Sequence, residues 1–239
     1  MKIRLITLPN IVTLCNLLCG SAATVYALVL SDLQTAFWLV VAAAVFDFLD
    51  GFTARLTGSF SPVGKELDSL SDMVSFGVAP SSVLFVMYQT QSGAFAGGGI
   101  DPWGFAVFIL AAFSALRLAK FNIDESQSYE FEGLPTPAAA LLVCSAGYLF
   151  ADGVYAVRPY YILLSALCLS YFLVSPVRMF ALKFHGYGLH EPQNLLRYVF
   201  LLVSLAALVL FRIGAVPFIV MAYILVSLVR NIVMSLRRG

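Results

Sequence analysis

Charged residues are scarce in this sequence. Asp, Glu, Lys and Arg make up 11% of the 239 residues, against about 25% in an average soluble domain. Hydrophobic residues make up 61%, and the mean hydropathy is +0.92. The formal net charge is only +1, so no basic or acidic excess indicates a nucleic acid partner. We therefore expect a protein surrounded by membrane lipid that binds no nucleic acid.

Cysteine and histidine are also rare, which removes several kinds of site. The four cysteines all lie in apolar stretches, and the C-x-x-C spacing of redox and zinc sites is absent. His185 and His190 share a glycine-containing loop, to which we assign no role. Internal repeats, low-complexity tracts and long polar linkers are lacking too. One membrane domain spanning residues 1–239 is therefore the expected organisation.

Apolar stretches of about 20 residues recur along the chain, and this is the length of a helix that crosses a hydrocarbon core of about 30 Å. We predict an all-α integral membrane fold, a polytopic bundle of about eight transmembrane helices. The first stretch has no clear cleavage site of small residues, so we expect a retained helix, not a signal peptide. The predicted spans are 10–30, 33–56, 73–90, 103–121, 136–151, 158–176, 196–212 and 214–234.

Positive charges predict the orientation of these spans. If the N-terminus is inside, only Arg158 and Arg212 fall on the outer side, so 12 of the 14 Lys and Arg residues lie on the cytoplasmic side. Such an excess is typical of cytoplasmic loops. We expect both termini to be cytoplasmic, in the cell (inner) membrane.

Two pairs of aspartates lie at predicted helix ends. Asp47 and Asp50 end an apolar stretch, and their i, i+3 spacing places both carboxylates on one helix face. Ser61, followed by proline, is typical of a helix N-cap. The new helix would carry Asp68 and Asp72 at i, i+4, again on one face.

Four carboxylates on two neighbouring helices repel one another unless cations are present. All-oxygen sites select hard ions, so we predict two Mg²⁺ ions, with Mn²⁺ possible. A pair of such ions about 4 Å apart suits an in-line displacement at phosphorus. Two other interpretations remain open: solvated aspartates at a membrane interface, and a divalent-cation transporter with aspartates along its path. The clustering at one membrane face argues against a path.

The spacing Asp47-x2-Asp50-Gly51-x2-Ala54-Arg55-x8-Gly64-x3-Asp68-x3-Asp72 resembles the signature of the CDP-alcohol phosphotransferase family. The resemblance implies an enzyme that transfers a phosphatidyl group from a CDP-activated lipid to an alcohol, with an active site at the cytoplasmic face. It implies that all four aspartates are metal ligands. It also implies that Asp72 is the catalytic general base.

The same resemblance implies residues that contact the CDP part of CDP-diacylglycerol, namely Asn10, Thr13, Gly51, Arg55 and Ser61. Capping and helix packing explain three of these equally well. Ser61 has the sequence context of an N-cap, and Asn10 and Thr13 lie where the first helix begins.

Four further stretches are similar to the phosphatidylserine synthase branch of this family: 8–16, 71–80, 116–122 and 131–137. They extend over about 8–137, the predicted catalytic core, and leave helices at about 158–234 for packing or a dimer interface. The resemblance implies CDP-diacylglycerol and L-serine as substrates, phosphatidylserine and CMP as products, and a homodimer. Glycerol 3-phosphate or an inositol phosphate remains open as the acceptor.

Serine has a carboxylate that needs a cation and an amine that needs an acceptor. Arg117 and Lys120 follow the fourth span, with Asn122 close by, so we hypothesise that these residues bind serine. Anchoring of a helix end at the cytoplasmic surface explains the two basic residues equally well. Glu66 is an option for the amine, although a solvated position suits it better.

Overall fold

The structure, a computed structural model, describes residues 5–59, 61–123, 131–179 and 192–236. This part of the chain is mainly helical and contains two strands of two residues each. In chain order the elements are α1 (Leu8–Leu30), α2 (Leu33–Thr57), α3 (Pro62–Asp72), the π-helix η1 (Met73–Val78), α4 (Ala79–Gln91), the 3-10 helix η2 (Pro102–Phe108), α5 (Ile109–Ile123), β1 (Phe131–Glu132), α6 (Thr136–Ala151), α7 (Pro159–Val174), β2 (Arg178–Met179), α8 (Pro192–Phe211), the 3-10 helix η3 (Arg212–Gly214) and α9 (Ala215–Leu236).

The predicted all-α membrane fold is confirmed. Five helical stretches are long and apolar enough to cross a membrane, and the last of them, Leu195–Val233, includes most of α8 and most of α9. Two shorter apolar helices, α6 and α7, complete the set among the described residues. Each of the eight predicted spans therefore coincides with a helix, with ends that differ by a few residues. The sequence did not predict the antiparallel pair β1 and β2.

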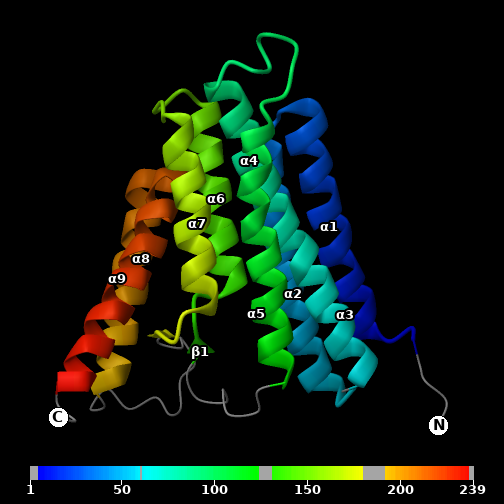
Figure 1. The fold of residues 1–239 in the computed structure, drawn as a ribbon. Helices are drawn as coiled ribbons and strands as arrows, with labels where there is room; N and C mark the ends of the chain where they lie inside the picture. Colours follow the sequence, from blue (N-terminus) through cyan, green and yellow to red (C-terminus); the bar gives the residue numbers. More distant parts are fainter. Residues whose placement is uncertain (1–4, 60, 124–130, 180–191, 237–239) are drawn as a thin grey trace.

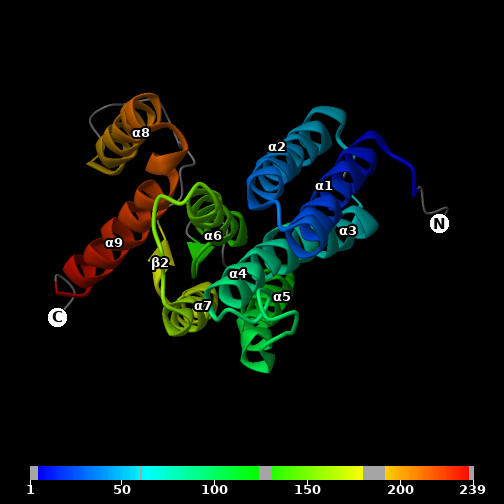
Figure 2. The ribbon, with the colours of Figure 1, turned by 90° about the horizontal axis from the view of Figure 1, so that it is seen from above.

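The helices form a bundle in which α1 to α3 lie on one side, α4 to α7 in the centre and α8 and α9 on the other side (Figure 2). In Figure 1 the described chain starts and finishes at the same, lower end of the bundle. Helix α1 packs along α2. Buried alanines at this contact, such as Ala23, Ala27 and Ala36, let the two backbones come close, as small residues do in membrane helix pairs.

The end of α2 and the start of α3 each have a defined cap. Gly58 ends α2 with φ of 62°, a left-handed conformation that glycine adopts without steric cost. Ser61 then caps α3, because its hydroxyl oxygen accepts a hydrogen bond from the Gly64 backbone N–H at 2.9 Å. The predicted N-cap and helix start are confirmed, and Asp68 of α3 lies close to the two aspartates of α2.

The helix predicted from residue 62 onward is not regular throughout. A π-helical segment, η1, follows Asp72 directly and leads into α4. Two residues of η1 touch neighbouring helices: Ser75 lies against Gly20 of α1, and Gly77 lies against Ser114 of α5. π-helical turns are rare and often occur at functional sites, so this segment favours a functional role for Asp72, which precedes it.

Several residues used in the sequence analysis lie outside the described part of the chain. They are Lys2, Arg4, Lys183, His185, His190, Arg237 and Arg238.

Candidate functional site

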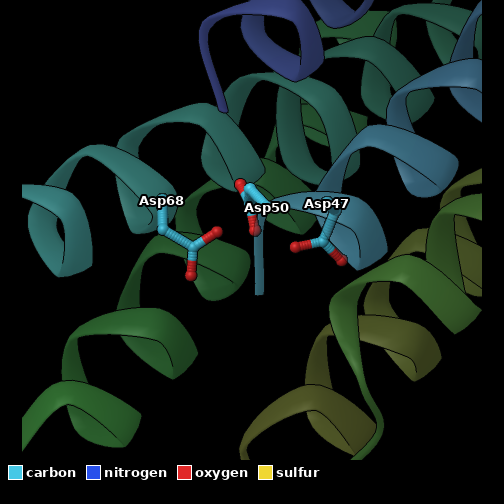
Figure 3. Close-up of side chains that lie close together, drawn as sticks. All are labelled: Asp47, Asp50 and Asp68. Atoms are coloured by element: carbon cyan, nitrogen blue, oxygen red, sulfur yellow. The ribbon is translucent and has the colours of Figure 1, made fainter. Parts of the chain in front are cut away.

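Three aspartates converge where α2 meets α3. Asp47 and Asp50 extend from α2 and Asp68 from α3, and Figure 3 shows their carboxyl groups turned toward a common space. One carboxylate oxygen from each lies within 4.8 Å of the other two. Within the described residues, Asp50 Oδ2 and Asp68 Oδ1 are buried and accept no hydrogen bond. The sequence predicted this convergence, and the structure shows it for three of the four aspartates.

The arrangement fits a divalent cation. Carboxylate oxygens this close repel one another, and burial of unpaired acceptors is costly, so a cation between them removes both penalties. Oxygens on opposite sides of one ion are about 4 to 5 Å apart for Mg²⁺ to Ca²⁺, and the three carboxylate oxygens all lie within 4.8 Å of one another. The three residues therefore form an acidic cluster that could bind a metal.

Asp72 lies outside this cluster. It is 8% exposed, and its Oδ1 accepts a hydrogen bond from Asn16 Nδ2 on α1 at 3.0 Å. The sequence predicts Asp72 as a member of the same group as the other three aspartates, and no role is predicted for Asn16. The available signal was an amide side chain in the middle of an apolar stretch.

A cavity of about 450 Å³ adjoins the acidic cluster, and its volume lies within the usual range for small-molecule sites. Residues of α1, of α2, of the turn after α2 and of α3 line it. They include four of the five residues predicted to contact the CDP group, whereas the fifth, Arg55, is exposed and does not line it. The lining residues are Pro9, Asn10, Thr13, Asp50, Gly51, Ala54, Ser59, Ser61, Pro62, Gly64, Lys65 and Asp68.

Two of these lining residues also have structural hydrogen bonds. Asn10 Nδ2 donates to the Leu5 carbonyl at 2.8 Å. Thr13 Oγ1 donates to the Pro9 carbonyl at 3.0 Å and lies beside the Asp50 carboxyl group. Both bonds are local to residues 5–13 and order the start of α1, so a structural role and a place in the cavity wall are compatible.

The residues predicted to bind serine have different surroundings. Arg117 is 8% exposed, and its Nε has no hydrogen-bond partner in the described chain. Its guanidinium lies within electrostatic range of Asp72. Lys120 instead forms a surface ion pair with Glu132 at 3.0 Å. Of the two cations, Arg117 is therefore the one placed toward Asp72.

Asn122 links two helices near the same end of the bundle. Its Nδ2 donates to Ser69 Oγ on α3 at 2.9 Å, and its backbone carbonyl accepts from Lys65 Nζ at 2.7 Å. Glu66, the option for the serine amine, is exposed. The bonds of Asn122 join the end of α5 to α3 and so support the helix that carries Asp68.

Comparisons with known proteins agree with this geometry. Residues 6–175 match the model of the CDP-alcohol phosphatidyltransferase family. The chain is similar to proteins named CDP-diacylglycerol–serine O-phosphatidyltransferase. That of Helicobacter pylori J99 is 43% identical over 140 residues, 56% of this chain and 54% of the relative. That of Methanocaldococcus jannaschii is 37% identical over 140 residues, 59% of this chain and 60% of the relative.

A third relative is similar over more of its length. The Bacillus subtilis protein of the same name is 29% identical over 188 residues, 79% of this chain and 95% of the relative. The chain spans only a little more than half the length of the Helicobacter pylori relative. The family match, in contrast, extends over most of the chain and contains the acidic cluster, the cavity and Asp72. This chain belongs to the CDP-alcohol phosphatidyltransferase family.

Proposed function

We propose that this protein transfers a phosphatidyl group from CDP-diacylglycerol to L-serine, which yields phosphatidylserine and CMP. The observation that carries the proposal is the convergence of Asp47, Asp50 and Asp68 at the wall of a cavity between α1, α2 and α3. Family membership supports CDP-activated lipid as the donor. The names of the three relatives support serine as the acceptor.

Asp47, Asp50 and Asp68 would hold the metal, and Asp72 is close enough along α3 to contribute to a second ion. We propose two Mg²⁺ ions, with Mn²⁺ as a possible substitute, because hard ions prefer carboxylate ligands. When bound, the ions would neutralise the pyrophosphate and stabilise the charge on the departing CMP. One buried oxygen each of Asp50 and Asp68 has no hydrogen-bond partner among the described residues, which supports this assignment.

The remaining steps belong to side chains of the protein. The cavity residues Asn10, Thr13, Gly51 and Ser61 would bind the cytidine and its phosphates, and exposed Arg55 would be a further phosphate contact. Buried Arg117 would hold the serine carboxylate, because a charge-assisted hydrogen bond is strong away from water.

Asp72 would act as general base and accept the proton of the serine hydroxyl. The hydroxyl oxygen then attacks the phosphorus that bears diacylglycerol, and the bond from that phosphorus to the oxygen of CMP breaks. The short distance from Asp72 to the acidic cluster, one turn along α3, supports this role.

Position in the membrane and assembly are part of the same proposal. The protein would lie in the cell (inner) membrane, and the positive charges favour an orientation with both termini and the active site on the cytoplasmic side. A homodimer is proposed through the C-terminal helices, since α8 exposes most of its apolar side chains, for example Val199, Leu202 and Val209. Labelling of introduced cysteines with a membrane-impermeant reagent tests the orientation, and cross-linking in vesicles tests the dimer.

The decisive experiment uses the purified protein in vesicles that contain CDP-diacylglycerol and Mg²⁺. Radiolabelled serine, glycerol 3-phosphate and an inositol phosphate are supplied one at a time, and labelled phospholipid and CMP are measured. We expect both products with serine and only background with the other two. Product from another alcohol would change the acceptor. Absence of CMP with every alcohol, together with Mg²⁺ uptake into the vesicles, would favour a transporter.

A further inference from the structure

Asn16 is a buried polar residue of α1 that contacts Asp72, the proposed general base. It is fully buried, two turns after the start of the cavity wall at Pro9 and Asn10. Its side-chain amide donates to Asp72 Oδ1 at 3.0 Å. Its backbone carbonyl accepts from Ser75 Oγ, also at 3.0 Å. Two hydrogen bonds of equal length therefore connect Asn16 to the segment that contains Asp72 and η1.

The side chain of Asn16 has little structural reason to be polar. Its Oδ1 is buried and unpaired among the residues that the structure describes, and an orphaned buried acceptor costs about 1–3 kcal/mol. Reversal of the amide would bring its oxygen against the Asp72 carboxylate, where two acceptors repel, so the N–H group faces Asp72. A leucine of similar size would avoid the cost of the unpaired oxygen. The contact with Asp72 thus remains as the explanation for an amide here.

Asp72 is the one of the four aspartates that Asn16 contacts through a hydrogen bond. Asp47, Asp50 and Asp68 form the acidic cluster, whereas Asp72 Oδ1 is already bound to α1. A hydrogen bond from an amide N–H to one carboxylate oxygen limits rotation of the Asp72 side chain and leaves the other oxygen, Oδ2, for a substrate proton. Outer partners of this kind orient reactive side chains.

We propose that Asn16 is a positioning residue, which holds the Asp72 carboxylate in the orientation needed for proton transfer. This inference rests on the proposed function and adds to it a residue outside the signature of the family. If Asn16 positions Asp72, its loss should reduce turnover and leave substrate and metal affinity nearly unchanged.

The test compares Asn16→Leu and Asn16→Ala with Ser75→Ala. The control removes the other 3.0 Å hydrogen bond at the same contact and leaves the bond to Asp72 in place. We expect both Asn16 variants to lower kcat on the order of 10- to 100-fold, with KM for serine and for CDP-diacylglycerol within about threefold. Ser75→Ala should retain kcat within about threefold.

Thermal unfolding with and without Mg²⁺ gives a second measurement that does not depend on turnover. We expect the Asn16 variants to show the same Mg²⁺-induced rise in Tm as the wild type. A normal kcat in Asn16→Leu, or an equal loss of kcat in Ser75→Ala, would overturn the positioning role alone. Loss of the Mg²⁺ response would place Asn16 in metal binding and also overturn it. A wild type that makes no phosphatidylserine would overturn the proposed function as well.

Discussion

Gly20 on α1 and Ser75 in η1 meet with no space for a side chain between them. A Cβ atom on Gly20 would lie 2.5 Å from the Ser75 Cα, so any other residue would force the two backbones apart. This contact follows Asn16 by one turn of α1 and follows Asp72 by three residues of the other helix. The approach of α1 to η1 therefore sets the distance between Asn16 and Asp72.

Gly20→Ala should loosen this contact and lower both stability and activity. Overpacking of a tight contact costs about 1–3 kcal/mol, and the shift would lengthen the bond from Asn16 to Asp72. We expect a lower Tm in detergent and a reduced kcat. Gly99→Ala is the matched control, since a Cβ there meets no atom within 4 Å. Equal behaviour of the two variants would show that the α1 to η1 contact tolerates a methyl group.

The acidic cluster predicts an opposite effect of mutation on stability with and without metal. Asp50→Asn and Asp68→Asn each remove one of several mutually repelling charges, so the metal-free protein should be at least as stable as the wild type. Bound Mg²⁺ stabilises the wild type by about 2.7 kcal/mol at 100 times its Kd. Both variants should lose most of this gain.

Titration of Tm against Mg²⁺ measures this response. Asp152→Asn serves as the control. Asp152 follows α6 and accepts a hydrogen bond from Gln34 at the start of α2, whereas the cluster aspartates of α2 lie in its second half. We expect this variant to keep the full Mg²⁺ response. If Asp50→Asn responds to Mg²⁺ as the wild type does, the metal is bound elsewhere.

Local sequence signals were sufficient to predict the helices, the start of α3 and the helix faces that carry the aspartates. The apolar stretches predicted each span, and Ser61 before Pro62 predicted the start of α3, because both depend on residues next to one another in the sequence. The spacing of the aspartates indicated which faces they share. In these cases geometry within one helix determines the outcome.

Contacts between distant segments were not predictable in the same way. The hydrogen bond from Asn16 to Asp72 joins residues 56 positions apart, and η1 contacts α1 at Ser75 and α5 at Gly77, again across long sequence separations. The different surroundings of Arg117 and Lys120 are a further example. Both follow the fourth span, yet only tertiary packing turns Arg117 inward and pairs Lys120 with Glu132.

Arg117 and Lys120 should therefore differ in their effect on serine binding. A hydrogen bond to a charged group contributes about 1.5–3 kcal/mol, so Arg117→Ala should raise KM for serine at least about tenfold. An exposed ion pair contributes about 0–1 kcal/mol, so Lys120→Ala should raise it far less. Kinetics at saturating CDP-diacylglycerol separate the two residues. A larger effect of Lys120→Ala would assign the serine carboxylate to Lys120.

Asn231 of α9 should stabilise the connection between the two short strands and the C-terminal helix. Its Oδ1 accepts from the Arg178 backbone N–H at 3.2 Å, and its Nδ2 donates to the Arg178 carbonyl at 2.6 Å. Arg178 in turn pairs with Glu132 across β1 and β2. Asn231→Leu removes both bonds and leaves two backbone groups without this partner, so stability should fall by about 1–3 kcal/mol. Hydrogen exchange at 177–179 should accelerate.

Asn231→Asp is the graded comparison, because it keeps the acceptor for the Arg178 N–H and loses only the donor to its carbonyl. We expect exchange intermediate between the wild type and Asn231→Leu, measured by mass spectrometry on the protein in detergent. Since β1 carries Glu132, the partner of Lys120, the same variants should also weaken the hold on the end of α5. Unchanged exchange at 177–179 in Asn231→Leu would show that α9 contributes nothing to the order of β2 and that the β1 pairing alone maintains it.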